Sequence, residues 1–358
     1  MQLFDFGMSP EQEEKAIVLH REAVVIDMLT ESDFTGSFFD DIAEGGLTCG
    51  SFTIGALGLQ HTLDHTLPQH DDWWSREATI KDLGIWHGIF NERADQLVHV
   101  RSVADIRSAK DEGKNGILIN TQNSICIGTD VDNLDFFYNL GLRVMQITYN
   151  NQNFMASGCL EDPKKNLSNF GKQAIERMNE LGILVDTGHT GDGSLKHAIE
   201  VSSRPISCSH AGLASQSSDA NPRVQSDSAL KMLADNGGVF GLSAIPGMLT
   251  GNDRCTINDY LDHMEYAINL MGVDHVGLGT DFIDGPSYEQ IATAPDWKGV
   301  QVPTNVEVWP VCSGHEGLEN QSQFLNFTRG LVSRGYSDED VLKLVGGNWL
   351  RLLEETIG

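Results

Sequence analysis

Eight short, nearly continuous apolar runs alternate along the chain with longer segments in which apolar positions recur at helical spacing. Runs that are apolar throughout are typical of parallel strands buried on both faces. The segments 130–142, 167–182 and 257–272 have the pattern of amphipathic helices, and the last two end at glycines that suit helix C-caps. The predicted strands are 23–29, 48–57, 116–123, 143–150, 182–189, 205–210, 237–245 and 275–282.

Eight strands separated by helices predict an α/β fold, a (β/α)₈ barrel that forms one domain over residues 1–358 and ends in a helical tail at 337–355. An open, doubly wound sheet is the alternative, because a count of strands does not prove closure. Neither GxGxxG nor GxxxxGK[ST] follows the first run, which weighs against nucleotide-binding folds. The segment at about 58–110 is rich in Trp, His and charged residues. We expect it to form a lid insertion over part of the barrel mouth.

The chain carries 24 basic and 51 acidic residues, which is a formal net charge of −27. This charge argues against nucleic acid and anionic membrane surfaces as partners, because both attract basic patches. No window reaches the ~18 consecutive apolar residues of a membrane span, and the first residues lack the basic region and apolar core of a signal peptide. We therefore expect a cytoplasmic protein whose six widely spaced cysteines are free thiols.

Candidate chemistry lies at the predicted strand ends, because barrels place their active sites where the carboxyl ends of the strands meet. His189 and His210 end two consecutive strands, and neutral imidazoles in one mouth suit Zn²⁺. Each histidine alone also fits a hydrogen-bonded strand end without a metal. Three more histidines, in GLQHTLDHTLPQH at 58–70, favour a solvated lid over a ligand cluster. The other polar residues at strand ends are Asp27, Gln122, Tyr149 and Asp281.

An ordered set of passages points to a known family: EGGLTCGSFTIGAL, NLGLRVMQITYNNQN, NELGILVDTGHTG, PISCSHAG, DHVGLGTDF and GGNWLRLLEE. In these passages the chain resembles the membrane (renal-type) dipeptidases, the M19 metallopeptidases of the amidohydrolase superfamily, over nearly its whole length. The resemblance implies a TIM barrel of the metal-dependent hydrolase type, with two bridged zinc ions, that hydrolyses dipeptides. It places His189 and His210 as ligands of one metal and Asp281 as the general base that touches the other metal.

The resemblance also implies that Arg223, in NPRVQSD, holds the substrate carboxylate. An arginine fork binds a carboxylate with two parallel hydrogen bonds. A surface ion pair is the alternative interpretation of Arg223. Tyr149 stands where the family has a histidine that contacts the reacting centre. Its phenol can donate a hydrogen bond to an oxyanion, or it can simply pack in the barrel.

The chain departs from the family pattern at the first metal. Where the family has Asp-x-His-x-Asp, this sequence reads Asp27-Met28-Leu29-Thr30-Glu31. Leu29 has no lone pair to offer, and Glu31 keeps a carboxylate with one more methylene. Gln122 replaces the family's bridging glutamate with a neutral amide. We therefore expect at most one tightly held divalent cation per chain, Zn²⁺ or another metal, on His189 and His210 with Gln122 and Glu31 as weak ligands.

Three functional hypotheses remain from the sequence. The first is a metal-dependent hydrolase of a dipeptide or a related small amide, with Asp281 as base and a single substrate carboxylate on Arg223. The second is another chemistry on the same barrel, of the deaminase, lactonase or lyase type, since one fold hosts many reactions. The third is a catalytically silent homologue that binds a small molecule or a partner. The sequence leaves the oligomeric state open, and a homo-oligomer is compatible with it.

Overall fold

Eight parallel strands close into a barrel in the computed structural model, which describes residues 3–32, 38–55, 74–217, 221–251, 254–284 and 315–358. Each strand pairs with the next, and the last pairs with the first through Asp27 and Leu278. Closure confirms the predicted barrel and excludes the open sheet. In barrel order the strands are β1 (Ile26–Ser32), β2 (Cys49–Thr53), β4 (Asn115–Thr121), β5 (Val144–Gln146), β6 (Leu184–Asp186), β7 (Ser207–Leu213), β9 (Val239–Leu242) and β11 (Val276–Leu278).

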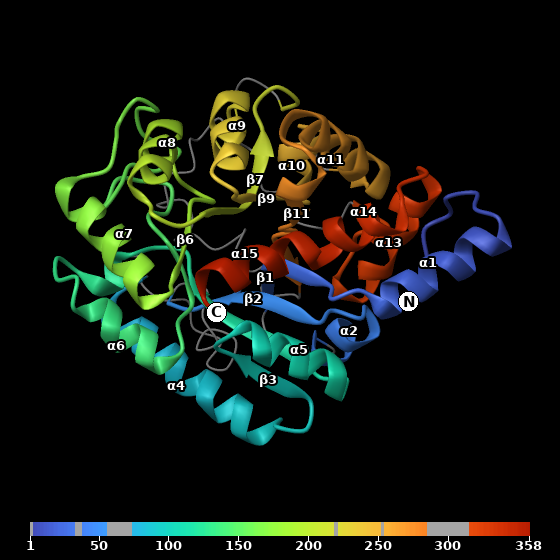
Figure 1. Ribbon diagram of the computed structural model, residues 1–358, viewed down its shortest axis with the longest axis horizontal. Coiled ribbons are helices and arrows are strands. Elements are labelled where there is room, and N and C mark those ends of the chain that lie inside the picture. The colour runs from blue at the N-terminus through green and yellow to red at the C-terminus, as the bar shows by residue number, and fades with distance from the viewer. Residues whose placement is uncertain (1–2, 33–37, 56–73, 218–220, 252–253, 285–314) are drawn as a thin grey trace.

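Helices cover the outside of the barrel, as Figure 1 shows for α6 to α9 and α11. The three amphipathic segments expected from the sequence form α6, α7 and α11, and α7 ends at Gly182 in the left-handed conformation. The helices are α1 (Pro10–Glu22), α2 (Phe38–Glu44), α4 (Arg76–Glu92), α5 (Val103–Glu112), α6 (Asn133–Leu140), α7 (Asn169–Leu181), α8 (Asp192–Val201), α9 (Asp227–Asp235), α10 (Pro246–Leu249), α11 (Ile257–Met271), α13 (Phe324–Ser333), α14 (Asp338–Leu342) and α15 (Asn348–Thr356).

The predicted lid segment, 58–110, is described only from residue 74 onward. That part forms α4, the short strand β3 (Leu97–Val100) and the start of α5. Strand β3 pairs in parallel with the first half of β4. Residues 58–73, with the three histidines discussed above, lie outside the described residues. The lid and the single-domain organisation stay predictions.

The C-terminal tail is helical as predicted, with α14 and α15 joined by a π-helical turn at Lys343–Gly347. It is also part of the core. Trp349 is fully buried and donates from its indole Nε1 to the carbonyl of Leu278, at 2.8 Å. Asn348 caps the neighbouring carbonyl of Val276, also at 2.8 Å. Trp349 packs with Ile26, at the start of β1, in one apolar cluster, so α15 closes the amino-terminal end of the barrel.

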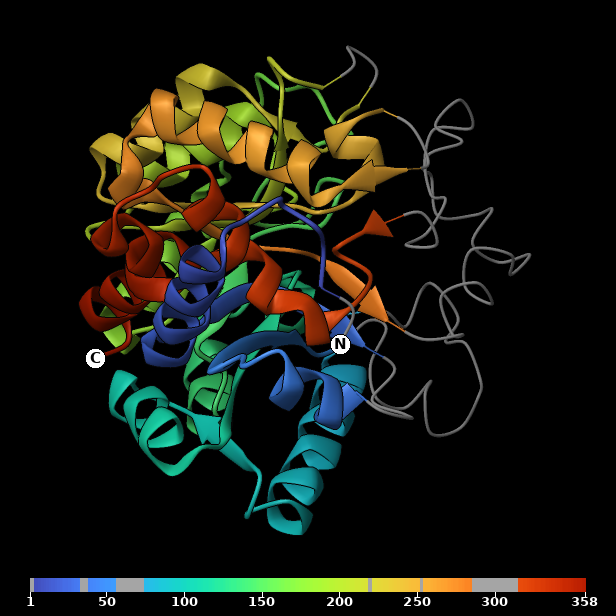
Figure 2. The same cartoon turned by 90° about the vertical axis from the view of Figure 1, so that its right-hand side faces the viewer.

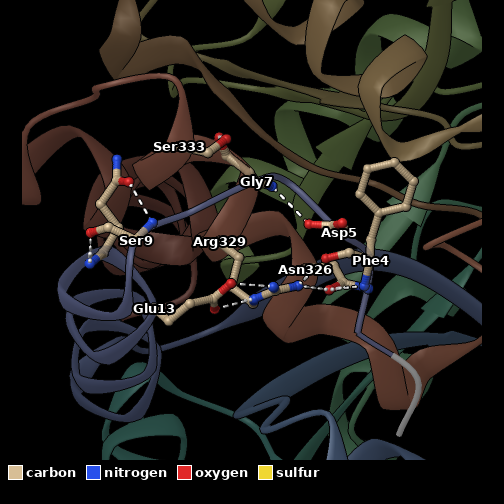
Figure 3. Close-up of polar contacts among 10 residues, drawn as sticks. Phe4, Asp5, Gly7, Ser9, Glu13, Asn326, Arg329 and Ser333 are labelled. Carbon is tan, nitrogen blue, oxygen red and sulfur yellow. Dashed lines mark hydrogen bonds and ion pairs between the residues drawn. The ribbon is translucent and has the colours of Figure 1, made fainter.

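The N-terminal segment is held against the C-terminal half by a polar cluster that we call the clamp, formed by Phe4, Glu13, Asn326 and Arg329 (Figure 3). Helix α1 packs along α13. Arg329 donates to both carboxylate oxygens of Glu13, at 2.7 and 2.5 Å, and from Nη1 to the Phe4 carbonyl and the Asn326 side chain, at 2.6 and 2.8 Å. The clamp therefore ties together segments more than 300 residues apart.

Two further expectations concern cysteines and membranes. Five of the six cysteines fall in the part of the chain that the structure describes, and all five are free thiols, as expected. Cys312 lies outside it. Among the described helices, none combines the length and the apolar character that a bilayer crossing requires.

Candidate active site

Four of the polar residues at the predicted strand ends lie toward the carboxyl end of the barrel, whereas Asp27 is the second residue of β1 and does not end it. Gln122 directly follows β4, His189 comes three residues after β6, His210 lies within β7, and Asp281 comes three residues after β11. Because all of these strands are parallel, their carboxyl ends share one mouth. In Figure 2 the arrowheads of the blue β1 and the orange β12 (Phe282–Asp284) point to this end, on the right, whereas the chain's C-terminus lies on the left.

His189 and His210 lie side by side, with ring centroids 4.9 Å apart and ring planes inclined by 64°. Both side chains are almost completely removed from solvent. Burial, reinforced by the nearby charge of Arg223, holds the pKa of each imidazole well below its ordinary value. Both rings are therefore neutral at pH 7. A neutral imidazole keeps one nitrogen lone pair, which is what a metal ion requires.

Each of the two imidazoles has its Nδ1 atom occupied by a hydrogen bond. His189 Nδ1 lies 2.7 Å from Oδ1 of Asn150, a residue in the left-handed conformation at φ 55°. The Cys159 thiol donates to the same oxygen at 3.4 Å. His210 Nδ1 lies 2.8 Å from the hydroxyl of Ser209. In each ring this leaves Nε2 as the nitrogen for another partner. For the buried Nε2 of His210, no hydrogen-bond partner exists among the described residues.

An aromatic stack stands against His189. The Tyr149 ring stacks on the imidazole, with centroids 3.9 Å apart and planes inclined by 25°. Trp74 follows on Tyr149 at 5.2 Å. Tyr149 thus lies at the mouth, next to a predicted metal ligand, and also packs there. Both sequence-based interpretations of this residue therefore remain open, and its catalytic role stays a prediction.

Arg223 is buried beside the two histidines, just before the short strand β8 (Val224–Gln225), which pairs with β7. Its Nη1 donates to the carbonyl of Gly188 at 2.5 Å. Its Nε and Nη2 have no oxygen or nitrogen partner within the described ranges. Gly188 has room only for hydrogen at Cα, because a Cβ there would lie 2.7 Å from the His210 ring. The geometry therefore excludes a surface ion pair for Arg223 and leaves a cationic fork with two donors to offer.

Asp281 occupies a strained position at the mouth. Its φ is +56°, a conformation that costs a non-glycine residue energy and that clusters at functional sites. The backbone N–H of Asp281 donates to the Leu29 carbonyl at 2.9 Å and holds this turn in place. The preceding Thr280 donates through both its N–H and its hydroxyl to buried Asp27, at 2.8 and 2.5 Å. Burial raises the pKa of Asp281 to about 6, and the charge of Arg223 opposes that rise.

Asp27 is the second buried carboxyl group in this region. Burial raises its pKa to about 7, while the two hydrogen bonds from Thr280 act in the opposite direction. Its carboxyl oxygens are both engaged by Thr280, so it supports the turn before Asp281. Asp27 therefore supports the backbone next to the predicted base, Asp281, through Thr280.

Three residues depart from the family pattern at the first metal, namely Leu29, Glu31 and Gln122. Leu29 is buried in β1. The Gln122 amide donates from Nε2 to Thr53 Oγ1 at 3.0 Å, which turns the amide nitrogen toward β2. Glu31 lies in β1 beside β12, but its side chain is not part of what the structure describes. Its role as a weak ligand stays a prediction.

The residues at the mouth fit a divalent cation through the two imidazoles. Both rings are neutral, both have Nδ1 occupied, and the Nε2 of His210 is buried without a described partner. Across the described residues, no group of three or more His, Cys, Asp and Glu side chains is placed to hold a metal. The histidine pair therefore offers two nitrogen ligands for one cation, and its metal role stays a prediction.

Several residues that shape this mouth escape sequence reasoning. Asp186 and Ser209 support His210, Asn150 supports His189, and Trp74 backs Tyr149. Asp186 and Ser209 each precede a candidate histidine closely, in VDTGH and SCSH. That short spacing was the available signal. Their contact depends on the register of β6 and β7, which pairs Asp186 with Ser207.

Known proteins resemble this chain in sequence and in fold. The family described as membrane dipeptidase (peptidase family M19) matches residues 54–296, more than half of the chain. Dipeptidase aclJ of Aspergillus oryzae is 29% identical over 77% of this chain and 60% of its own length. Dipeptidase verJ of Clonostachys rogersoniana is 27% identical over 78% of this chain and 65% of its own length. This chain thus spans 60 to 65% of the length of these two relatives.

A solved structure shows the same fold over nearly the full length. It is described as an amidohydrolase from Pseudomonas aeruginosa and is 29% identical. The superposition has a TM-score of 0.79 and covers 95% of this chain and 98% of that one.

Proposed function

Because the chain belongs to the membrane dipeptidase family, peptidase family M19, we propose that it is a metal-dependent hydrolase that cleaves a dipeptide or a related small amide with one carboxylate. One observation carries this proposal. A buried arginine offers two unpartnered nitrogens, within the described residues, beside two neutral histidines. A cationic fork next to a potential metal site matches a substrate that presents an anion close to its reacting carbonyl.

Arg223 anchors the substrate in this proposal. Its Nη1 is already held by the Gly188 carbonyl, so the guanidinium plane is fixed before the substrate arrives. Nε and Nη2 lie on one edge of the guanidinium group and suit the two oxygens of one carboxylate. The buried setting makes these hydrogen bonds strong, because water competes little there. A polyanion would leave negative charge next to Asp281 and is disfavoured.

Asp281 serves as the general base. With a pKa of about 6, this carboxyl group is mostly ionised at pH 7 and remains basic enough to accept a proton from the attacking water. The same group can return that proton to the leaving amine. Its negative charge also favours an amino or amide nitrogen near the carboxylate of the substrate. Tyr149 is proposed to donate its phenolic proton in a hydrogen bond to the oxyanion that forms.

His189 and His210 would hold one divalent cation, with Gln122 and Glu31 as weaker ligands. Zn²⁺ suits the imidazole donors best, and when bound it supplies Lewis-acid polarisation of the scissile carbonyl. The neutral state of both rings and their occupied Nδ1 atoms support this ligand role. Leu29 and the amide of Gln122 support a single cation per chain over a bridged pair.

Elemental analysis combined with a matched substrate pair tests the proposal. The purified chain is loaded with Zn²⁺, desalted and assayed on dipeptides with a free carboxylate and on the same dipeptides capped as carboxamides. We expect at most one equivalent of zinc and cleavage of the free acids only. Two tightly bound equivalents would contradict the single site, and equal cleavage of capped and free forms would contradict the Arg223 anchor.

Assays of the same zinc-loaded protein on a lactone and an amino-substituted ring, with a binding measurement on a carboxylate ligand, separate the other hypotheses. Bound zinc with no cleavage of any dipeptide, but with turnover of a lactone or an amino-substituted ring, would identify a different chemistry on this barrel. Binding of a carboxylate ligand without any turnover would identify a silent homologue.

A further inference from the structure

We propose that Asp186 is a positioning residue that acts through Ser209 to hold the His210 imidazole in the tautomer with its proton on Nδ1. The three side chains form one chain of hydrogen bonds from the barrel wall to the mouth. The Ser209 hydroxyl lies 2.7 Å from Asp186 Oδ2 and 2.8 Å from His210 Nδ1. All three residues are buried. The inference goes beyond the proposed function, because it concerns what prepares His210 before any substrate or metal arrives.

The Asp186 carboxyl group takes part in four hydrogen bonds, two at each oxygen. Its Oδ1 accepts from the Ser209 N–H at 2.6 Å and from the Ser207 hydroxyl at 2.8 Å. Its Oδ2 accepts from the Ser209 hydroxyl and, at 3.4 Å, from the Gly188 N–H. An ionised carboxylate accepts and never donates. Burial raises the pKa of Asp186, and the hydrogen bonds from Ser209, Ser207 and Gly188 act against that rise. The relay uses the carboxylate form, which accepts from all of these donors.

The direction of the second hydrogen bond follows from proton counting. A serine hydroxyl has one proton to donate and lone pairs with which to accept. Since the Ser209 proton goes to Asp186, the Ser209 oxygen must accept from His210, and the donor is Nδ1–H. A neutral imidazole has only one N–H, so Nε2 then carries the lone pair. That Nε2 is the buried atom that has no partner in the described part of the chain.

Strand register explains why Asp186 and Ser209 meet. Asp186 ends β6 and is the register partner of Ser207 in β7. Ser207 and Ser209 both hydrogen-bond to the Asp186 carboxyl group, and the register of β7 against β9 shifts between Cys208 and Ala211, so Ser209 and His210 lie at an irregularity of the strand. Both serines thus face Asp186, and His210 reaches the mouth from the next position. Histidine ligands commonly donate their second ring N–H to a carboxylate or a carbonyl, and here a serine is interposed.

The test is the tautomer itself, measured by nitrogen-15 NMR on the full chain labelled at histidine and freed of metal with a chelator. The His210 signals are assigned by their loss in His210→Ala. For the wild type we expect Nδ1 to show the protonated, pyrrole-type shift and Nε2 the pyridine-type shift. The opposite pattern in the wild type would overturn the proposal, and this result requires only the assignment variant, His210→Ala, to fold.

Asp186→Asn provides the decisive variant. Its amide oxygen is expected to keep the position that accepts from Ser209 N–H and Ser207, so its NH₂ group faces the Ser209 hydroxyl and donates to it. Ser209 must then donate to His210 Nδ1, and the imidazole proton moves to Nε2. We expect inverted shifts for His210 and a loss of Zn²⁺ affinity of about 10–100-fold. Unchanged His210 shifts in folded Asp186→Asn would refute the relay.

Two internal controls separate positioning from general damage. Ser207→Ala removes one hydrogen bond of Asp186 and leaves Ser209 in place, so the His210 shifts should stay as in the wild type. His189 uses Asn150 instead, so its shifts should not change in Asp186→Asn. If His189 changes together with His210, the effect is global and the proposal fails. Because the tautomer is measured without metal or substrate, its outcome is independent of whether the chain hydrolyses dipeptides.

Discussion

Arg329 and Arg223 are buried to nearly the same degree, with 4% and 6% of each residue exposed, but they differ in their partners. In the clamp, all three nitrogens of Arg329 donate to Glu13, Phe4 or Asn326 (Figure 3). At the mouth, only Nη1 of Arg223 donates to an oxygen of the described residues. Burial alone therefore does not separate a structural arginine from a binding one, whereas the count of satisfied donors does.

The acids near the two arginines differ in the same way. Hydrogen bonding to Arg329 lowers the pKa of Glu13, so this acid is fixed in its ionised form. Burial raises the pKa of Asp281 to about 6, and Arg223 only moderates that rise. An acid locked into an ion pair is inert, whereas one with a raised pKa can exchange protons near pH 7. The clamp thus supplies stability, and the mouth retains groups that can still react.

The largest contrast is expected between Asp281→Asn and Glu13→Gln. Removing the base should lower kcat by about 10²–10⁴-fold while zinc content and unfolding midpoint stay near the wild type. Glu13→Gln should leave kcat unchanged and lower the unfolding midpoint. Steady-state kinetics, elemental analysis and thermal unfolding on both variants check this. Loss of activity in Glu13→Gln at a temperature where it is folded would break the comparison.

Arg329→Ala should destabilise the fold more than any change at Arg223. It leaves Glu13, about one-third exposed, without its partner. We expect a loss of about 3 kcal/mol in the free energy of unfolding, at the lower end of the range for a broken buried pair. In Arg223→Ala the expected change is within about 1 kcal/mol, because only one oxygen, that of Gly188, loses a donor. Urea unfolding of the two variants gives both numbers, and equal losses would contradict the assignment.

Arg223→Ala should instead weaken substrate binding. A charge-assisted hydrogen bond contributes about 1.5–3 kcal/mol, which corresponds to a rise in KM of roughly 10–100-fold for substrates with a carboxylate. Zinc content should stay intact. If kcat/KM is unchanged for every carboxylate substrate that is turned over, the anchor is wrong and the hydrolase proposal rests on the histidines and Asp281.

The smallest expected effect is a shift in pH dependence. Asp281 acts as a base only when ionised, so kcat/KM should fall as the pH drops through about 6. The charge of Arg223 lowers the pKa of Asp281, so its removal raises that pKa and moves the acid limb to higher pH. A pH profile of Arg223→Ala measured against Arg223→Lys, which keeps the charge, checks the sign. A limb that moves to lower pH in Arg223→Ala would contradict the placement of these two groups.

Much of the fold was predictable because it depends on local patterns. Each of the eight apolar runs overlaps one barrel strand, and the three amphipathic segments form helices. Closure was not visible in the sequence, since Asp27 and Leu278 are paired only through the complete circle. The tail was correctly predicted as helical. Its place in the core was not predicted, because the contact of Trp349 with Leu278 at the barrel is visible only in the structure.

The candidate site was predictable in its residue types and only partly in its connections. His189 and Asp281 follow strands and His210 lies within β7, three residues before its end, and that placement put them at one mouth. The relay from Asp186 depends on the register between two strands, and the strained φ of Asp281 depends on Asp27 and Thr280. Neither feature produces a periodic pattern in the sequence, so neither could be predicted from it. The cytoplasmic location and the metal roles of Gln122 and Glu31 stay predictions.

The burial of Trp349 also sets an order for folding during synthesis. Trp349 follows Leu278, whose carbonyl it caps, by 71 residues, and at translation rates of 5–20 residues per second this distance takes roughly 4–14 s to synthesise. During that interval all eight strands have been synthesised, but α15 does not yet close the amino-terminal end of the barrel. The Arg329 side of the clamp is also made after the last strand, so the N-terminal segment waits for its partner. The nascent barrel is therefore exposed to aggregation and to chaperones through its base, at the end opposite the reactive mouth.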